Sequence, residues 1–170
     1  MTTPTIRDEA TGDEGTIRSI TTAAFVTVPY SQGTEAAIID ALRRDEALTV
    51  SLVALDEGEI VGHIAFSPAT IDGEQRGWFG VGPLSVRPDR QNRGIGGSLV
   101  RAGLERLRAL GAKGCVLVGK PNYYERFGFK ADARLTLDGV PPQYFQALSF
   151  GGELPRGSVS FHPGFGAKDE

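Results

Sequence analysis

The chain has 170 residues and a formal net charge of −3, and its composition is 40% hydrophobic and 23% charged. This length suits one domain with a buried core, and the composition is that of a globular protein. The small negative charge gives neither a nucleic-acid footprint nor a polybasic membrane patch, and no run of about 18 apolar residues predicts a membrane span. The polar, acidic start lacks the apolar core of a signal peptide, so we expect a cytoplasmic protein. A single cysteine, Cys115, leaves no cysteine cluster for a metal.

The first half of the chain predicts a strand, two helices and a hairpin. Residues 5–8 can form a short strand. Apolar residues recur at helical spacing over 13–25 and again over 35–42. Two β-rich runs, 49–55 and 59–66, are separated by the turn residues DEG, which predicts an antiparallel hairpin.

The second half predicts a β-α-β unit. A strand over 76–86 leads into a glycine-rich loop, a helix runs to about Leu110, and the wholly apolar run 114–119 predicts a strand buried on both faces. A strand, a helix and a strand in this order form parallel neighbours, so with the hairpin the sheet is mixed. The remaining predicted elements are a brief helix, a late strand, a loop and a second late strand, at 121–127, 128–137, 140–145 and 156–162.

The stretch RQNRGIGGSLV, residues 90–100, puts three glycines among arginines where a helix begins. Glycine disfavours helix, so the pattern indicates that a ligand approaches the backbone closely. Free N–H groups at a helix start favour an anion. A Walker loop would need a lysine before Ser98, and the dinucleotide pattern GxGxxG would need glycine where Leu99 stands.

The loop resembles the acetyl-CoA loop of the GNAT (general control-related) N-acetyltransferase superfamily, written Gln/Arg-x-x-Gly-x-Gly/Ala. Gln91, Gly94 and Gly96 occupy its required positions, and residues 124–129 match a second family pattern, Tyr-x-x-x-Gly-Phe. The chain resembles small single-domain members of bacterial type over about 3–160 of one domain, residues 1–170. The resemblance implies an α/β (α+β) GNAT fold, in which a central mixed β-sheet with a splayed parallel strand pair is flanked by helices.

The resemblance implies acetyl-CoA as cosubstrate and no metal. Pro83 cannot donate a ladder bond, so we expect a bulge or an unpaired stretch there, with strands that splay and leave the backbone of residues 84–86 free for the pantetheine arm. The implied cofactor-binding residues are Leu84, Ser85, Val86, Gln91, Asn92, Arg93, Gly94, Ile95, Gly96, Gly97, Ser98 and Asn122. Arginines that could meet the phosphates of CoA are Arg87, Arg90, Arg93 and Arg126.

Transfer by direct attack of an amine on the thioester needs a polarised carbonyl and a proton for the departing thiolate. By its place before Gly128, Tyr124 matches the family's general acid, and a backbone N–H of Leu84 or Val86 could polarise the carbonyl. The general base is less defined, because many members use a carboxylate on the strand where this chain has residues 80–82, Gly-Val-Gly. His63 could face the cleft as the base or could be a core histidine, and a water could serve instead.

We therefore expect an N-acetyltransferase that moves acetyl from acetyl-CoA to a primary amine of a small molecule or peptide. The alternative is a non-catalytic acyl-CoA-binding sensor module. A homodimer is compatible with the resemblance, whereas nothing indicates a nucleic-acid or membrane partner. The sequence leaves open the identity of the amine and the use of longer acyl-CoAs. Aromatic residues in two loops could wall the acceptor pocket: Tyr30, Tyr144, Phe145 and Phe150.

Overall fold

A computed structural model describes residues 3–169, so three residues of the predicted domain, 1, 2 and 170, lie outside the described part. The helices are α1 (Glu14–Phe25), α2 (Glu35–Arg44), α3 (Ile95–Ala109) and α4 (Pro121–Tyr124). The strands are β1 (Thr5–Asp8), β2 (Val50–Asp56), β3 (Glu59–Ile71), β4 (Glu74–Val86), β5 (Gly114–Val118), β6 (Leu135–Thr136), β7 (Phe145–Ser149) and β8 (Gly157–Ser160).

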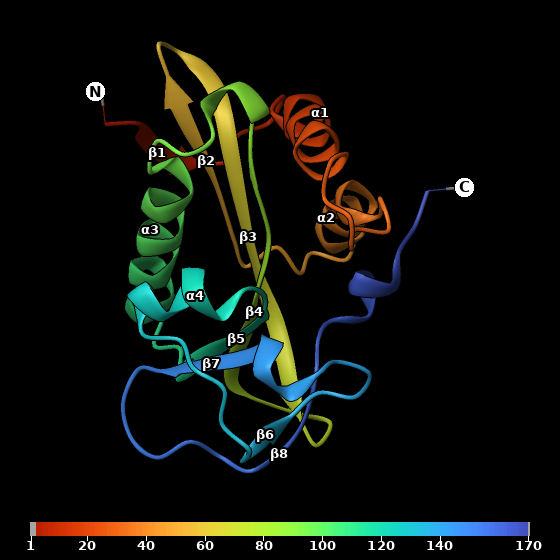
Figure 1. The fold of residues 1–170 in the computed structure, drawn as a ribbon, viewed down its shortest axis with the longest axis vertical. Helices are drawn as coiled ribbons and strands as arrows, with labels where there is room; N and C mark the ends of the chain where they lie inside the picture. The colour runs from red at the N-terminus through yellow and green to blue at the C-terminus, as the bar shows by residue number, and fades with distance from the viewer. Residues whose placement is uncertain (1–2, 170) are drawn as a thin grey trace.

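The strands form a mixed sheet in the order β1-β2-β3-β4-β5-β7, with β8 beside the end of β3 and β6 beside β8. β4 and β5 are parallel, as are β6 and β8, and the other neighbours are antiparallel. The predicted hairpin and the parallel crossover through α3 are therefore both confirmed (Figure 1).

Helices cover both faces of the sheet, α1 and α2 on one side and α3 on the other (Figure 1). On the first face, Val53 of β2 packs with Ile17 of α1 and Ile39 of α2. On the second face, Gly62 of β3 lies so close to α3 that a β-carbon there would be 3.0 Å from the side chain of Leu99. The helices thus hold β3 and β4 at the centre of the molecule.

The late part of the chain differs from the prediction. Phe145–Ser149 is strand β7, antiparallel to β5, although the predicted loop reached its first residue and no strand was expected there. Gln146 and Ser149 interrupt the apolar pattern of this strand, so the sequence does not indicate that its first three residues are buried. In the predicted strand 128–137 only Leu135–Thr136 forms a strand, and Lys130 makes a single antiparallel bridge to Ala147. Between them Arg134 donates both its N–H and its guanidinium to Asp132 and forms a turn.

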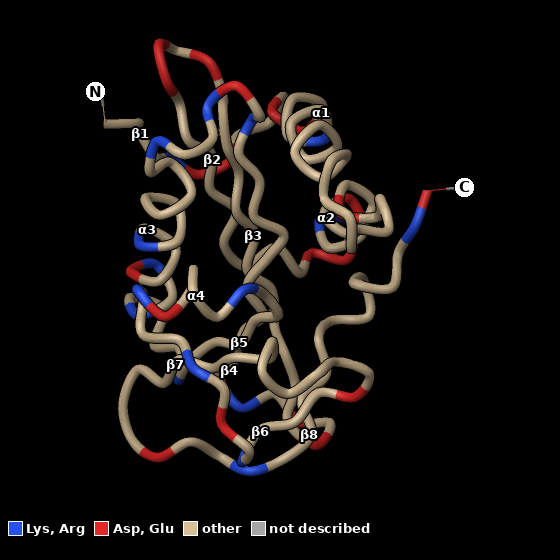
Figure 2. The backbone as a smooth tube through the Cα atoms, in the orientation of Figure 1, with Lys and Arg blue, Asp and Glu red and all other residues tan. Residues whose placement is uncertain are grey.

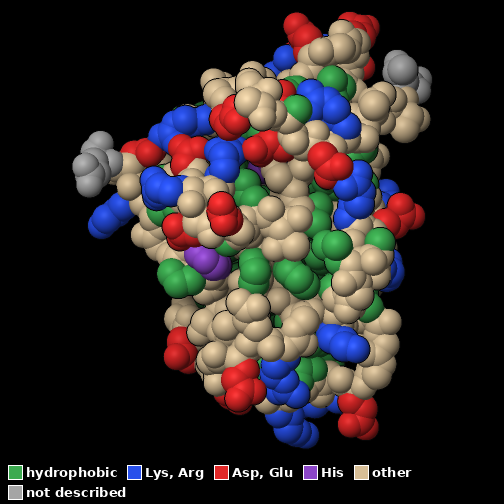
Figure 3. Space-filling model, turned by 180° about the vertical axis from the view of Figure 1, so that it is seen from behind, with side chains coloured by type: hydrophobic (Ala, Val, Ile, Leu, Met, Phe, Trp, Pro, Cys, Tyr) green, Lys and Arg blue, Asp and Glu red, His purple; other side chains and the backbone are tan. Residues whose placement is uncertain are grey.

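Charged residues of both signs are spread along the chain and are intermixed on the face turned away in Figure 1 (Figures 2 and 3). The segment between β4 and α3 is mainly basic, since it holds Arg87, Arg90 and Arg93 with Asp89. Among residues 3–169, no helix has the length and apolar character to cross a membrane.

Candidate active site

The parallel strands β4 and β5 pair only as far as Gly80. The register of β4 against β3 then shifts, and Gly82–Pro83 lies opposite the single residue Ala65, which is a β-bulge. Past the bulge β4 continues along β3, whereas β5 continues along β7. We call the stretch between residues 84–86 of β4 and 117–119 of β5 the wedge. The predicted bulge at Pro83 and the predicted splay are both confirmed.

Only part of the β4 backbone faces the wedge. The N–H of Arg87 donates to the carbonyl of Val61 in β3, at 2.7 Å. Because hydrogen-bonding direction alternates along an antiparallel ladder, the N–H and C=O of Ser85 also point to β3, and those of Leu84 and Val86 point to the wedge. The expectation that Ser85 is unpaired is therefore wrong, while Leu84 and Val86 lie as expected.

Side chains on the same stretch reinforce this arrangement. The Ser85 hydroxyl, 2% exposed, shares a hydrogen bond of 3.0 Å with the hydroxyl of Thr21 in α1, on the side of the sheet away from α3. The side-chain amide of Gln91 donates to the carbonyl of Val86, at 3.0 Å. Gln91 thus ties the glycine-rich loop to the strand that borders the wedge.

The loop reverses direction through two residues with positive φ, Asn92 at 64° and Gly94 at 83°. Helix α3 then begins at Ile95, whose side chain is buried against β3. The first N–H groups of a helix have no partner within it, so those of residues 95–97 are free to bind an anion. Ser98 is already inside the helix, because its N–H donates to the carbonyl of Gly94.

Gly96 lies in a crowded place. A β-carbon at this position would lie 3.0 Å from the hydroxyl of Tyr123 in α4 and 3.7 Å from the side chain of Val86. The first turn of α3, the phenol of Tyr123 and the end of β4 therefore meet at one point. A larger residue at position 96 would crowd the phenol of Tyr123 and the side chains at the end of β4.

The four arginines near the loop differ in their partners. Arg87 and Arg90 both pair with Asp89, and Arg90 also pairs with Asp56. Arg126 lies over the ring of Tyr123, with 4.7 Å between its guanidinium carbon and the ring centroid. Arg93 is exposed, and within residues 3–169 it makes no ion pair. Of the four, Arg93 is thus the arginine whose guanidinium has neither a carboxylate nor an aromatic ring as partner among residues 3–169.

Tyr124 lies at the β5 side of the wedge, where its ring rests against Gly119. A β-carbon at Gly119 would be 2.5 Å from that ring. The ring also contacts Tyr123 and Phe129 edge-on, at centroid distances of 4.9 and 6.0 Å. Burial, with smaller contributions from Tyr123 and Tyr30, raises the pKa of the Tyr124 phenol above its ordinary value, so the group is protonated at neutral pH. Asn122 is exposed on α4, immediately after β5.

His63 lies on the face of β3 that α1 and α2 cover, and it is 0% exposed. Its Nε2 is 2.7 Å from the hydroxyl of Ser51, which donates to Glu9, and Arg43 binds the same carboxylate through two nitrogens. Burial lowers the pKa of His63 to about 4. Because the imidazole is buried under α1 and α2, an amine in the wedge cannot contact it. The structure therefore disfavours His63 as the general base and favours a core histidine.

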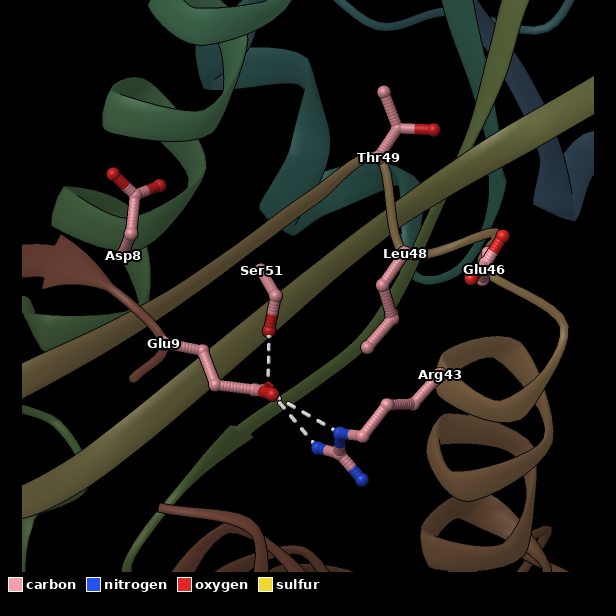
Figure 4. Close-up of a pocket in the computed structure, with 7 residues that line it drawn as sticks. All are labelled: Asp8, Glu9, Arg43, Glu46, Leu48, Thr49 and Ser51. Atoms are coloured by element: carbon pink, nitrogen blue, oxygen red, sulfur yellow. Dashed lines mark hydrogen bonds and ion pairs between the residues drawn. The ribbon is translucent and has the colours of Figure 1, made fainter. Parts of the chain in front are cut away.

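The network around His63 borders a cavity of about 420 Å³ that Figure 4 shows. Glu9 extends from the end of β1 toward Ser51 of β2 and Arg43 of α2. None of the residues that line this cavity belongs to the loop, the wedge or α4. The cavity is therefore separate from the candidate active site.

Among residues 3–169 no group of three or more His, Cys, Asp or Glu side chains could hold a metal ion.

The place of the family's carboxylate on β4 is covered by an aromatic ring. A β-carbon at Gly80 would lie 2.5 Å from the ring of Phe161, which follows β8. Phe161 in turn stacks on Phe165 at a centroid distance of 4.9 Å. This part of β4 can therefore carry no side chain at position 80 in the present packing.

Of the four aromatic residues expected around the acceptor, two have the required exposure. Tyr30, between α1 and α2, is 72% exposed, and Tyr144, just before β7, is 42% exposed. Phe145 is buried in the core with Trp78. Phe150 lies under the guanidinium of Arg108, at 4.6 Å, beyond the far end of β7.

Sequence reasoning also missed Gln146 and Phe161, because neither stands in a pattern that identifies its neighbours.

Comparison with known proteins agrees with this geometry. Residues 16–129 match the acetyltransferase (GNAT) family. Over 105 residues the chain is 39% identical to a protein of Escherichia coli named as the N-acetyltransferase YhbS, and this match covers 61% of the chain but only 63% of that protein. A crystal structure of a GNAT family acetyltransferase from Brucella melitensis in complex with acetyl-CoA is 51% identical, covers 95% of this chain and 97% of its own, and has a TM-score of 0.86. The structure of YhbS from E. coli in complex with CoA is 31% identical, with a TM-score of 0.89 and coverage of 98% and 93%.

Proposed function

Because the chain belongs to the acetyltransferase (GNAT) family, we propose that it transfers an acetyl group from acetyl-CoA to a primary amine of a small molecule or a peptide. The observation that carries this proposal is the wedge, with the free helix N-terminus at one end and Tyr124 beside it. The complex of the Brucella relative with acetyl-CoA supports the choice of cosubstrate. Location in the cytoplasm and a homodimeric state stay predictions from the sequence.

In the proposed complex, the amides of the pantetheine arm hydrogen-bond to the N–H and C=O of Leu84 and to the N–H of Val86, whose carbonyl accepts from Gln91, as an added strand would. The pyrophosphate lies on the N–H groups at the start of α3, with Arg93 beside it. The loop residues Gln91 to Ser98 shape this site through their backbone, and Asn122 lies on the neighbouring helix α4.

The amine nitrogen then attacks the thioester carbon, whose oxygen is polarised by a backbone N–H of Leu84 or Val86. The C–S bond breaks as the C–N bond forms, the thiolate takes a proton from the phenol of Tyr124, and water returns a proton to the resulting phenolate. The proton released by the amine passes to water, because Phe161 covers position 80 and His63 is buried.

The test is the release of CoA thiol when the purified protein is mixed with acetyl-CoA and a panel of primary amines. Thiol release that depends on the amine, with a matching acetylated product by mass spectrometry, supports the proposal. Tight acetyl-CoA binding without thiol release for any amine would instead indicate the acyl-CoA sensor.

A further inference from the structure

Gln146 of β7 is a buried polar residue whose hydrogen bonding is incomplete. Its side chain is 1% exposed and lies opposite Leu117, next to the end of β5. Its Nε2 donates to the carbonyl of Gly119, at 3.0 Å, while its Oε1 is buried and has no partner among the described residues. A half-satisfied amide is less stable in a core than an apolar side chain of the same size, so folding alone does not explain this residue.

Gly119 connects Gln146 to the candidate acid. The residue is held from both sides, because its N–H donates to the carbonyl of Tyr144 at 3.0 Å and its C=O accepts from Gln146. The ring of Tyr124 rests on its α-carbon, at a distance that leaves no room for a β-carbon. Leu117, Gly119 and Gln146 share one face of the sheet, so the amide and the ring contact the same short segment of backbone.

We propose that Gln146 is a positioning residue for Tyr124: its amide fixes the carbonyl of Gly119 and thereby the backbone surface that sets the place of the phenol in the wedge. The inference rests on the proposed function, in which Tyr124 protonates the leaving thiolate. A displacement of the acid by about 1 Å lowers the rate substantially even when binding is intact.

The first test is Gln146→Leu, which removes the donor and keeps a similar volume. We expect kcat to fall about 10-fold, with the KM for acetyl-CoA changed less than about threefold, because only the placement of the acid is altered. Gln75→Leu, at an exposed position in β4, is the matched control and should retain wild-type kinetics. Circular dichroism and the melting temperature establish that each variant is folded.

The second test is a double-mutant cycle with Tyr124→Phe. If Gln146 acts through the Tyr124 phenol, adding Gln146→Leu to Tyr124→Phe changes the residual kcat by less than about twofold. A further tenfold loss in that background would overturn the inference, because Gln146 would then act on another group.

The third test uses Gln146→Glu. A protonated carboxyl can donate to the carbonyl of Gly119, and an ionised one cannot. The ratio of the kcat of this variant to that of wild type should therefore be highest at low pH and fall as the glutamate ionises. A ratio that does not change with pH contradicts the role of the hydrogen bond to Gly119.

A readout without turnover separates this inference from the proposed function. With 3-fluorotyrosine incorporated, the ¹⁹F resonance of Tyr124, identified by its absence in Tyr124→Phe, should shift or broaden in Gln146→Leu and stay unchanged in Gln75→Leu. An unmoved resonance overturns the positioning role whether or not the protein turns over. A moved resonance in a protein that releases no thiol leaves the positioning role standing and rejects the proposed activity.

Discussion

The ring of Tyr124 occupies the volume that any side chain at position 119 would need, so the position of the ring depends on a glycine there. Burial raises the pKa of this phenol, which keeps it in the protonated form at neutral pH. The neighbouring Tyr123 has a different place, since its hydroxyl meets the first turn of α3 at Gly96. The two adjacent tyrosines therefore contact different elements, the end of β5 for Tyr124 and α3 for Tyr123.

Replacing Tyr124 by phenylalanine tests the acid directly. We expect kcat to fall by about 10² to 10⁴, the usual contribution of a positioned acid, with little change in acetyl-CoA affinity. Tyr123→Phe is the matched control, and it should retain most of the turnover. Steady-state kinetics measure kcat, and isothermal calorimetry measures the affinity for acetyl-CoA. Near wild-type turnover in Tyr124→Phe would leave the ring with a packing role only.

At the scale of elements, the sequence predicted the parts that depend on local pattern. The loop residues, the splay at Pro83 and the strand 114–118 follow from glycine, proline and apolar periodicity, which act within a few residues. The β7 strand, the contact of Phe161 with Gly80 and the place of Gln146 were not predictable, because each depends on which distant segment the chain brings alongside.

The start of α3 predicts that Gly96→Glu lowers acetyl-CoA affinity more than about 100-fold, because a carboxylate there would add bulk and negative charge where the pyrophosphate binds. Gly15 is the matched control, because it is also the second residue of a helix and has open space around it. Gly15→Glu should leave affinity unchanged. Isothermal calorimetry on the folded variants measures their affinity for acetyl-CoA. An affinity of Gly96→Glu equal to that of wild type would reject the loop as the phosphate site.

The wedge predicts a pattern of amide protection along β4. Acetyl-CoA should slow the hydrogen exchange of the Leu84 and Val86 N–H groups, which face the wedge, because the pantetheine arm pairs with them. The N–H of Ser85 should be protected already without ligand, since it faces β3. Amide exchange followed by NMR checks this, and an equal gain in protection at all three N–H groups when acetyl-CoA binds would contradict the assigned ladder directions.

At the scale of the whole molecule, the two faces of the sheet carry different tasks. The face under α3 and α4 holds Tyr124 and Gln146. The face under α1 and α2 buries the polar network of Glu9, Ser51 and His63. Sequence reasoning could not separate the two roles of His63, because a strand residue in a central position faces either layer depending on register.

The buried network makes the stability of the whole molecule depend on pH. The folded state keeps His63 neutral, since burial lowers its pKa from about 6.5 to about 4, with the nearby Glu9 carboxylate opposing and Arg43 adding to the shift. The unfolded chain therefore binds the extra proton between these values, and the free energy of unfolding should fall by about 3 kcal/mol as the pH drops from 7 to 4. For Glu9, burial opposes the hydrogen bonds from Arg43 and Ser51 that lower its pKa, and that stabilisation is lost as the pH falls below about 4.5, the ordinary value, toward the lowered one.

Urea unfolding of wild type and His63→Gln between pH 7 and 4.5 measures this contribution. Glutamine can keep a hydrogen bond to Ser51 but does not titrate, so the variant should lose most of the slope while other carboxylates affect both proteins alike. His162→Gln controls for the loss of a histidine outside this network and should keep the wild-type slope. Parallel stability curves for wild type and His63→Gln would show that the imidazole has the same pKa in the folded and the unfolded chain, which the hydrogen bond to Ser51 and the complete burial of the ring argue against.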